Sequence, residues 1–420
     1  MRSVKKFLGL GVVVSVNLVL QFLFQWYIIV YFGAGVESDI FFGSTAIPQF
    51  ILLVLSGSLT MVLIPMISKF KGADFLKESW NYFQGIGILF ASIALLLCLT
   101  AHWWVQWTLP GFRGDNYELA VDLTRIQLLS MLFSAMLSVL WAVHSARENF
   151  YLIETTSILS NLAGFILFYF ALEYLGIYAA AWVTVVKSFL QILLLMQVLG
   201  PHQKFNPLSG SFHVTWKKLK PLVAGNLYYK TDILVDKYLT SRGVSGELTL
   251  LNLAQQLYAA ANSILTKVLV NTMVPPLAKA HSDGDVTKFN HIFQKRLLVA
   301  LSLSLLVFIT ILLAGEWALG LVFTFKNFDA DDVNRLWWLL VLLAGFFSGG
   351  LMGAITSSAF YSKGDTITPT KIGAIIFTIY LPVKIFCYYK FGIKGLAVSV
   401  TVYYLLSLVV QLYFLRRHLK

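Results

Sequence analysis

The chain contains a long succession of apolar segments, each long enough to cross a lipid bilayer as a helix. A transmembrane helix needs about 20 apolar residues, because the hydrocarbon layer is about 30 Å thick. Twelve segments meet this requirement, and the connections between them are short. We therefore expect an all-α polytopic membrane protein without a soluble domain. The predicted spans are roughly 7–32, 40–68, 82–108, 123–145, 151–172, 177–199, 218–240, 248–278, 295–324, 335–360, 367–389 and 394–415.

Composition and charge agree with this class. Hydrophobic residues make up 58% of the 420 residues, charged residues only 12%, and the mean hydropathy is +0.75. The net charge of +12 is distributed in short basic clusters between the apolar runs, a pattern typical of loops that face anionic membrane lipid. We find no nucleic-acid-binding motif and expect no nucleic-acid partner.

The distribution of basic residues predicts the orientation. If the N-terminus is cytoplasmic, the cytoplasmic segments hold 20 of the 32 lysines and arginines, and the opposite loops hold six. An excess of basic residues marks the cytoplasmic side, so we expect both termini in the cytoplasm. The first apolar stretch runs to about Phe32, which is too long for a signal peptide and predicts a transmembrane helix.

The two halves of the sequence repeat one another. Glu37 to Pro65 parallels Glu247 to Pro275, and the segment from Leu175 parallels the one from Phe391. Six helices per repeat predict two lobes related by a pseudo-two-fold axis along the membrane normal, as in many transporters. We expect an N-lobe over 1–200, a cytoplasmic linker over 201–216 and a C-lobe over 217–420.

Four lysines lie inside predicted spans, although a lysine at the bilayer centre costs roughly 2.5–3.5 kcal/mol. Such residues either reach to the interface or serve a function in a protected interior. Lys384 is nearer the outer end of its helix than the others. We expect these side chains to bind an anionic cargo. The four are Lys187, Lys230, Lys267 and Lys384.

Polar residues in three other places could contribute to a site. Asn17, Gln21 and Gln25 follow one another at intervals of four, so their amides share one stripe of the first helix, either for helix packing or to contact sugar and phosphate. Asp39 could cap the second helix, gate the transporter or form an ion pair. Asp232 and Asp236 share a face of the seventh helix, within an ion-pair network or at a cation-coupling site.

Motifs for other chemistries are absent from the sequence. There is no Walker A phosphate loop, no His-Glu-x-x-His and no nucleophile elbow, and Cys98 and Cys387 have no metal-binding spacing. Glycines at positions 345, 349 and 353 indicate close helix packing. We therefore expect a secondary transporter rather than an enzyme, without metal or cofactor, coupled to Na⁺ or H⁺ if an ion drives it.

One stretch of sequence resembles a known family. Phe32-Gly-Ala-Gly-Val-Glu-Ser-Asp-Ile-Phe-Phe42, with Ile47-Pro48 and Ile64-Pro65 after it, resembles the MurJ/MviN family of lipid II flippases, and the segment from Gly246 to Pro275 is similar to that family's eighth helix. The resemblance implies the multidrug/oligosaccharidyl-lipid/polysaccharide exporter superfamily. It also implies a V-shaped cavity between two lobes and an undecaprenyl-diphosphate-linked saccharide as cargo.

The chain departs from that family at its arginines. The family's first-helix arginines fall on Leu18 and Phe24, and its next arginine pair falls on Leu52 and Leu53. The guanidinium clamp suited to a diphosphate is therefore missing. We expect lysines to replace it as point charges.

Together these features predict a flippase of the bacterial inner membrane. It would move a lipid II-like or other envelope-precursor lipid to the outer leaflet by alternating access, as a monomer, with envelope-synthesis enzymes as partners. The alternatives are a MATE-like drug/cation antiporter, a membrane glycosyltransferase or polymerase acting on the same lipid, and a transport-inactive scaffold.

Overall fold

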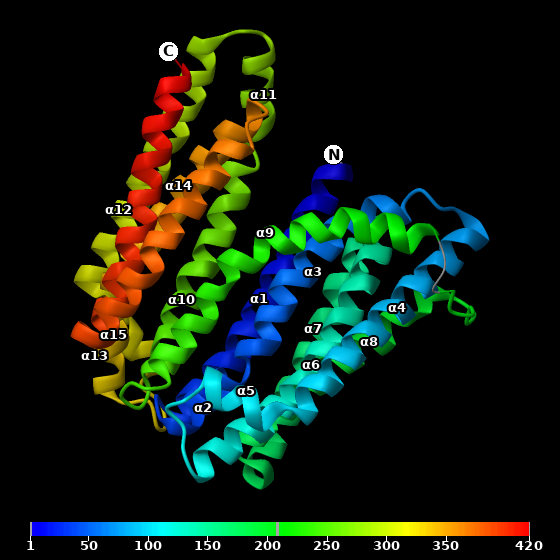
Figure 1. The fold of residues 1–420 in the computed structure, drawn as a ribbon, viewed down its shortest axis with the longest axis vertical. Coiled ribbons are helices and arrows are strands. Elements are labelled where there is room, and N and C mark those ends of the chain that lie inside the picture. Colours follow the sequence, from blue (N-terminus) through cyan, green and yellow to red (C-terminus); the bar gives the residue numbers. More distant parts are fainter. Residues whose placement is uncertain (1, 207–209, 420) are drawn as a thin grey trace. The chain divides into compact units, whose positions relative to one another are not determined.

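The computed structural model describes residues 2–206 and 210–419. They form two compact units, Met1–Arg242 (unit 1) and Gly243–Lys420 (unit 2) (Figure 1). Within the described residues, helices make up the regular structure, apart from one isolated β-bridge between Phe325 and Phe328. The all-α fold predicted from the apolar segments is confirmed.

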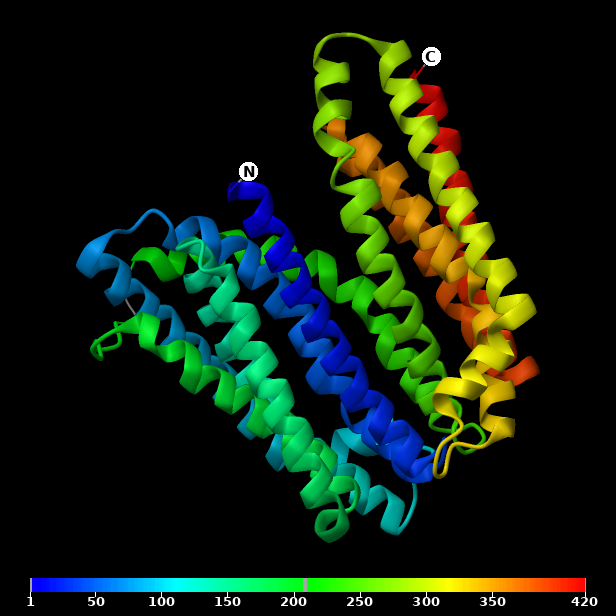
Figure 2. The same ribbon diagram turned by 180° about the vertical axis from the view of Figure 1, so that it is seen from behind.

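Unit 1 is built around α6, which packs against helices from both earlier and later in the chain. Its core joins α6 to α3, α4 and α8, and α1 runs beside α7 (Figure 2). The helices are α1 (Arg2–Phe32), α2 (Val36–Ser44), α3 (Ala46–Ile67), α4 (Gly72–Leu99), α5 (Ala101–Thr108), α6 (Asp115–Ala146), α7 (Phe150–Leu175), α8 (Ile177–Leu195), the 3₁₀ turn η1 (Met196–Leu199) and α9 (Gly210–Thr240).

Unit 2 is built in the same way around α14. Its apolar core joins α14 to α11, α12 and α15. The helices are α10 (Glu247–Leu265), the π-helical segment η2 (Thr266–Val270), α11 (Val274–Ser282), α12 (Val286–Phe323), α13 (Ala330–Leu342), α14 (Ala344–Ser362) and α15 (Ile367–Leu419).

Each predicted span lies in a helix or a short series of helices. In the described part of the chain, nine helical stretches are long and apolar enough to cross a membrane. The longest, within α15, holds two predicted spans, which are separated at Gly392, where a φ of 61° breaks the helix. The other two predicted spans fall in the more polar helices α9 and α10. That these two helices cross the membrane stays a prediction.

The packing groups α9 with unit 1, because this helix lies against α3. The predicted lobes, 1–200 and 217–420, follow the sequence repeat instead, and they remain a prediction about that repeat. Part of the predicted linker, residues 207–209, lies outside the described residues. The predicted V-shaped cavity concerns both lobes together and also remains a prediction.

The glycines of α14 pack closely against α15. A Cβ atom on Gly345 would lie 2.3 Å from the Thr401 side chain, and one on Gly349 would lie 2.9 Å from the Tyr404 backbone. A side chain at either position would push the helices apart. The close helix packing expected from these glycines is confirmed, except that Gly353 faces open space.

We predict that Gly349→Ala destabilises the protein by about 1–3 kcal/mol, the usual cost of overpacking a tight contact. Thermal unfolding in detergent would show a lower melting temperature. Gly353→Ala is the matched control in the same helix, and it should leave the melting temperature unchanged or slightly higher. Equal melting temperatures for Gly349→Ala and the parent protein would contradict the packing argument.

Candidate functional site

Lys187 of α8 lies at the centre of the candidate site. Its methylene stem packs on Gly164 of α7, where an added Cβ would lie 2.3 Å from the lysine Cγ. Its Nζ lies 4.3 Å from the centroid of the Phe24 ring on α1. An aromatic face attracts a cation through its quadrupole, so this contact holds the Lys187 side chain in place beside the ring.

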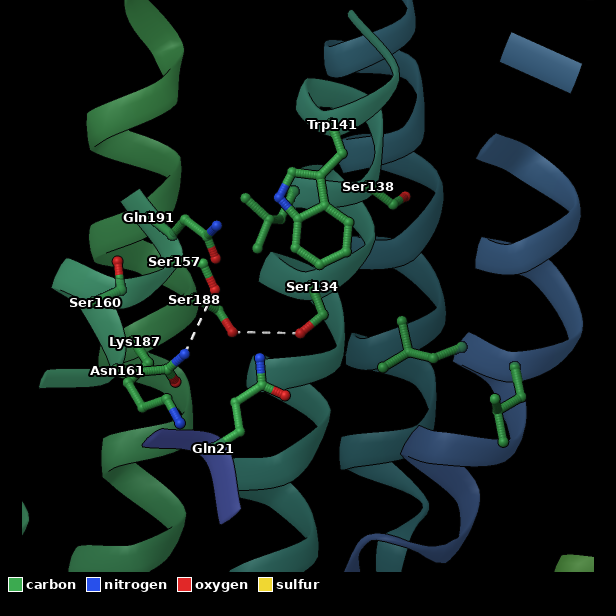
Figure 3. A pocket seen from close by; sticks show the side chains of 13 residues that line it. Gln21, Ser134, Ser138, Trp141, Ser157, Ser160, Asn161, Lys187, Ser188 and Gln191 are labelled. Atoms are coloured by element: carbon green, nitrogen blue, oxygen red, sulfur yellow. Dashed lines mark hydrogen bonds between the residues drawn. The ribbon is translucent and has the colours of Figure 1, made fainter. Parts of the chain in front are cut away.

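A cavity of about 370 Å³ opens beside this lysine, entirely within unit 1 (Figure 3). This volume is within the range of small-molecule sites. Helices α1, α3, α6, α7 and α8 each contribute to the wall. The lining residues are Gln21, Leu52, Leu53, Ser134, Leu137, Ser138, Trp141, Ser157, Ser160, Asn161, Lys187, Ser188 and Gln191.

A hydrogen-bond network fixes the wall between α1 and α7. The Asn17 side-chain oxygen accepts from Asn161 Nδ2 at 2.7 Å, Ser157 Oγ at 3.0 Å and Gln21 Nε2 at 3.3 Å. The Asn17 Nδ2 donates to the Glu154 carboxylate at 2.9 Å. Asn17 is therefore a buried junction between two helices, and it holds Gln21 and Asn161 at the cavity surface.

Hydroxyl groups and one indole ring form the opposite wall. Ser134 on α6 and Ser188 on α8 lie 3.3 Å apart, oxygen to oxygen, and form a hydrogen bond at the cavity wall (Figure 3). Trp141 on α6 is 37% exposed and presents its ring to the same space. Hydroxyls and amides can exchange hydrogen bonds with a sugar, and an indole ring can cover an apolar sugar face.

The electrostatic character of the cavity follows from its lining. Among the described residues that line it, Lys187 is charged and none is a carboxylate. The described residues also contain no group of three or more histidine, cysteine, aspartate or glutamate side chains placed to hold a metal ion. The arrangement fits a ligand that combines an anionic group with many hydroxyls.

The structure brings two of the predicted site residues to this cavity and places a third behind it. Lys187 and Gln21 line the cavity, and Asn17 supports it from within the helix pair. Gln25 is half-buried on α1 but does not line the cavity. Lys230 is half-buried on α9, also away from it.

The other two predicted lysines belong to unit 2. Lys267 is exposed and lies in the π-helical segment η2. Lys384, which we placed near the outer end of its helix, is completely buried, with its Nζ 5.2 Å from the Tyr380 ring centroid. Of the four lysines, the cavity in unit 1 therefore contains Lys187.

The predicted carboxylates lie elsewhere in unit 1. Asp39 is buried in the first turn of α2 and does not cap it, since Gly35 is the N-cap and Ser38 Oγ accepts its N–H at 3.1 Å. Asp232 is half-buried and Asp236 is buried on α9. The gating role of Asp39 and the cation-coupling role of Asp232 and Asp236 stay predictions.

Lys237, next to Asp236 on α9, is a buried cation that was not among the predicted site residues. Lys237 Nζ donates to the Phe42 carbonyl at 2.5 Å and to Thr45 Oγ1 at 2.8 Å. Phe42 lies in the last turn of α2, where carbonyl groups lack helical partners and favour a cation. Lys237 therefore attaches the end of α9 to the junction between α2 and α3.

Most polar residues of the cavity escaped the sequence analysis. A signal for them exists in the spacing: Ser157, Ser160 and Asn161 share one face of α7. Ser134, Ser138 and Trp141 likewise share a face of α6. A search for polar stripes on every predicted span, rather than on the first alone, would have found both.

The family assignment rests on most of the chain. A family model described as lipid II flippase MurJ matches residues 28–420. The lipid II flippase MurJ of Burkholderia cenocepacia is 26% identical over 377 residues, which cover 83% of this chain and 71% of that protein. The probable lipid II flippase MurJ of Buchnera aphidicola is 23% identical, with 96% of this chain and 82% of that protein covered.

Solved structures show the same fold. A lipid II flippase MurJ in an inward closed conformation has a TM-score of 0.80 at 17% identity, covering 97% of this chain and 87% of that one. An inward-facing MATE-family multidrug transporter of the MOP superfamily has a TM-score of 0.77 at 16% identity, with 98% of both chains covered.

At these identities the structural matches establish the fold, and the drug-transporter match is therefore no argument for drug export. The family model decides between the flippase, the antiporter and the enzyme that the sequence analysis considered. The resemblance seen around Phe32–Phe42 is confirmed, and the chain belongs to the lipid II flippase MurJ family, membrane transporters rather than enzymes.

Proposed function

We propose that the cavity beside Lys187 binds the diphosphate and the adjoining sugar of an undecaprenyl-diphosphate-linked saccharide, lipid II or a close relative of it. The flippase would then move this headgroup from the cytoplasmic to the outer leaflet while the lipid tail stays in the bilayer. The observation that carries the proposal is the position of the Lys187 ammonium group, which lies against Phe24 in a cavity lined by hydroxyl and amide groups.

The position of Lys187 is also suited to compensate for the family arginines that this chain lacks. In the resemblance described under Sequence analysis, Phe24, Leu52 and Leu53 are among the positions where that family has arginine. Leu52 and Leu53 line this same cavity, and the Phe24 ring lies below the lysine Nζ. We infer that Lys187, reaching in from α8, supplies from another helix the positive charge that α1 and α3 no longer provide.

The same charge disfavours a drug/cation antiporter. A cationic drug needs a carboxylate in its cavity, whereas the described lining here contains a lysine and no carboxylate. A phosphate group, in contrast, gains charge-assisted hydrogen bonds from an ammonium group, each worth about 1.5–3 kcal/mol.

The remaining features of the transport cycle are part of this proposal. Both termini face the cytoplasm, the protein works as a monomer by alternating access, and Na⁺ or H⁺ coupling involves Asp232 or Asp236. Its partners are the enzymes that make the lipid-linked saccharide on one side of the membrane and consume it on the other. The excess of basic residues in one set of loops supports the orientation.

We predict that Lys187→Gln reduces translocation of a fluorescent undecaprenyl-diphosphate saccharide at least ten-fold. Losing one charge-assisted bond to phosphate is sufficient for a change of this size, since a factor of ten corresponds to about 1.4 kcal/mol. The measurement is the rate at which the labelled lipid becomes accessible to a quencher outside proteoliposomes. Lys187→Arg keeps the charge and should restore most of the activity.

The matched control is Lys295→Gln, which removes the same charge at an exposed position of α12. It should transport at the parental rate. Parental rates for Lys187→Gln, in folded protein, would reject this lysine as the phosphate site and turn attention to Lys230, Lys267 and Lys384.

A second prediction tests the position of the charge rather than its presence. Gly164→Ala would place a methyl group against the Lys187 stem and push the ammonium group away from Phe24. We expect translocation to fall several-fold although no charge is lost. Gly11→Ala in α1, where a Cβ meets nothing within 4 Å, is the control. Unchanged transport by Gly164→Ala would show that the exact place of the ammonium group does not matter.

A further inference from the structure

A second cavity, of about 730 Å³, lies in unit 1 apart from the Lys187 site. It is formed where the α5–α6 connection meets the last turn of α9. Helix α5 lies at the end of unit 1 away from the N-terminus (Figure 1). In the proposed orientation this is the outer face. Six lining residues matter here: Trp107, Phe112, Arg113, Tyr117, Tyr238 and Arg242.

Close backbone packing brings the two arginines to this cavity. A Cβ on Gly111 would lie 1.6 Å from the Ser241 carbonyl oxygen and 2.8 Å from the Arg242 nitrogen, so a glycine is required where the loop crosses the end of α9. This contact places Arg113, two residues after Gly111, on the same cavity as Arg242. The backbone contact thus brings the two arginines to one cavity although they are far apart in the sequence.

An aromatic ring supports one of the two guanidinium groups. The Arg242 guanidinium carbon lies 4.5 Å from the Tyr238 ring centroid, a cation–π contact. The Tyr117 hydroxyl donates to the His102 carbonyl, which ties the start of α6 to α5. Among the described lining residues there are two guanidinium groups and no carboxylate. The lining therefore places two positive charges beside aromatic rings.

Tryptophans place the cavity at the level of lipid headgroups. Trp103 and Trp107 are 80% and 79% exposed and are four residues apart, so they share one face of α5. Exposed tryptophans gather at the boundary between hydrocarbon and water. Since Trp107 also lines the cavity, the cavity opens at this boundary.

We propose that this cavity binds the phosphate group of a lipid headgroup in the adjacent leaflet, the outer leaflet in the proposed orientation. Two guanidinium groups that line one cavity can match the oxygens of phosphate better than lysines do. The ligand is either an anionic phospholipid that stays bound or the diphosphate lipid after translocation. The two sources share the phosphate chemistry, and the site does not depend on Lys187.

The test is lipid retention measured by native mass spectrometry after release from nanodiscs. All proteins carry Lys187→Gln, which weakens the proposed lipid binding in the first cavity, so that the retained lipid reports on the second cavity. The nanodiscs contain phosphatidylcholine with either phosphatidylglycerol or undecaprenyl diphosphate added. We expect Arg113→Gln/Arg242→Gln to retain at least five-fold less of one or both added lipids. The lipid that is lost identifies the source.

Three comparisons make the result decisive. Lys390→Gln removes an exposed charge on α15 and should leave retention unchanged. Arg113→Lys/Arg242→Lys keeps both charges without the forked geometry and should retain an intermediate amount. If the double glutamine variant does not fold, Arg113→Gln alone, in an exposed loop, should lower retention by about half. Parental retention of both lipids in the folded variant would overturn the proposal.

Discussion

A positive charge inside a bundle of apolar helices is the constraint on which the rest of unit 1 depends. A lysine at the bilayer centre costs roughly 2.5–3.5 kcal/mol on insertion scales. The contact of Lys187 with the Phe24 ring returns about 0.5–2 kcal/mol of that cost. Gly164 provides room for the stem, and polar groups line the space beyond it. The α1–α7 network around Asn17 then holds this environment in place, since unpaired polar groups would be costly there.

The fold could be predicted from the sequence because it depends on segment length and charge, which need no knowledge of neighbours. Apolar runs of about 20 residues and short loops predicted the helices, and the glycines of α14 predicted a close helix contact without naming its partner. The cavity could be predicted only in part. Which faces meet depends on how each helix is rotated and on neighbours distant in sequence, such as α1 and α7, which are separated by more than a hundred residues.

The lysines show where the argument from sequence stops. Depth in a predicted span singled out Lys187, Lys230 and Lys267 and placed Lys384 nearer the outer end, yet the structure gives the four different environments. Lys384 and Lys187 each lie near an aromatic ring, whereas Lys267 is exposed in a π-helical segment. Lys237, next to the predicted Asp236, attaches α9 to the α2–α3 junction. Side-chain surroundings, rather than depth, distinguish these lysines from one another.

The hydroxyl wall of the Lys187 cavity has a consequence for ligand orientation. Four of its serine hydroxyls already donate their proton to acceptors in the wall, so they offer lone pairs to a ligand; these are Ser138, Ser157, Ser160 and Ser188. Such a wall accepts hydrogen bonds from sugar hydroxyls, whereas the Lys187 ammonium group can only donate. In the proposed binding mode the serines would favour the part of the headgroup that donates and the lysine the part that accepts, so hydrogen-bond polarity would orient the headgroup in the cavity.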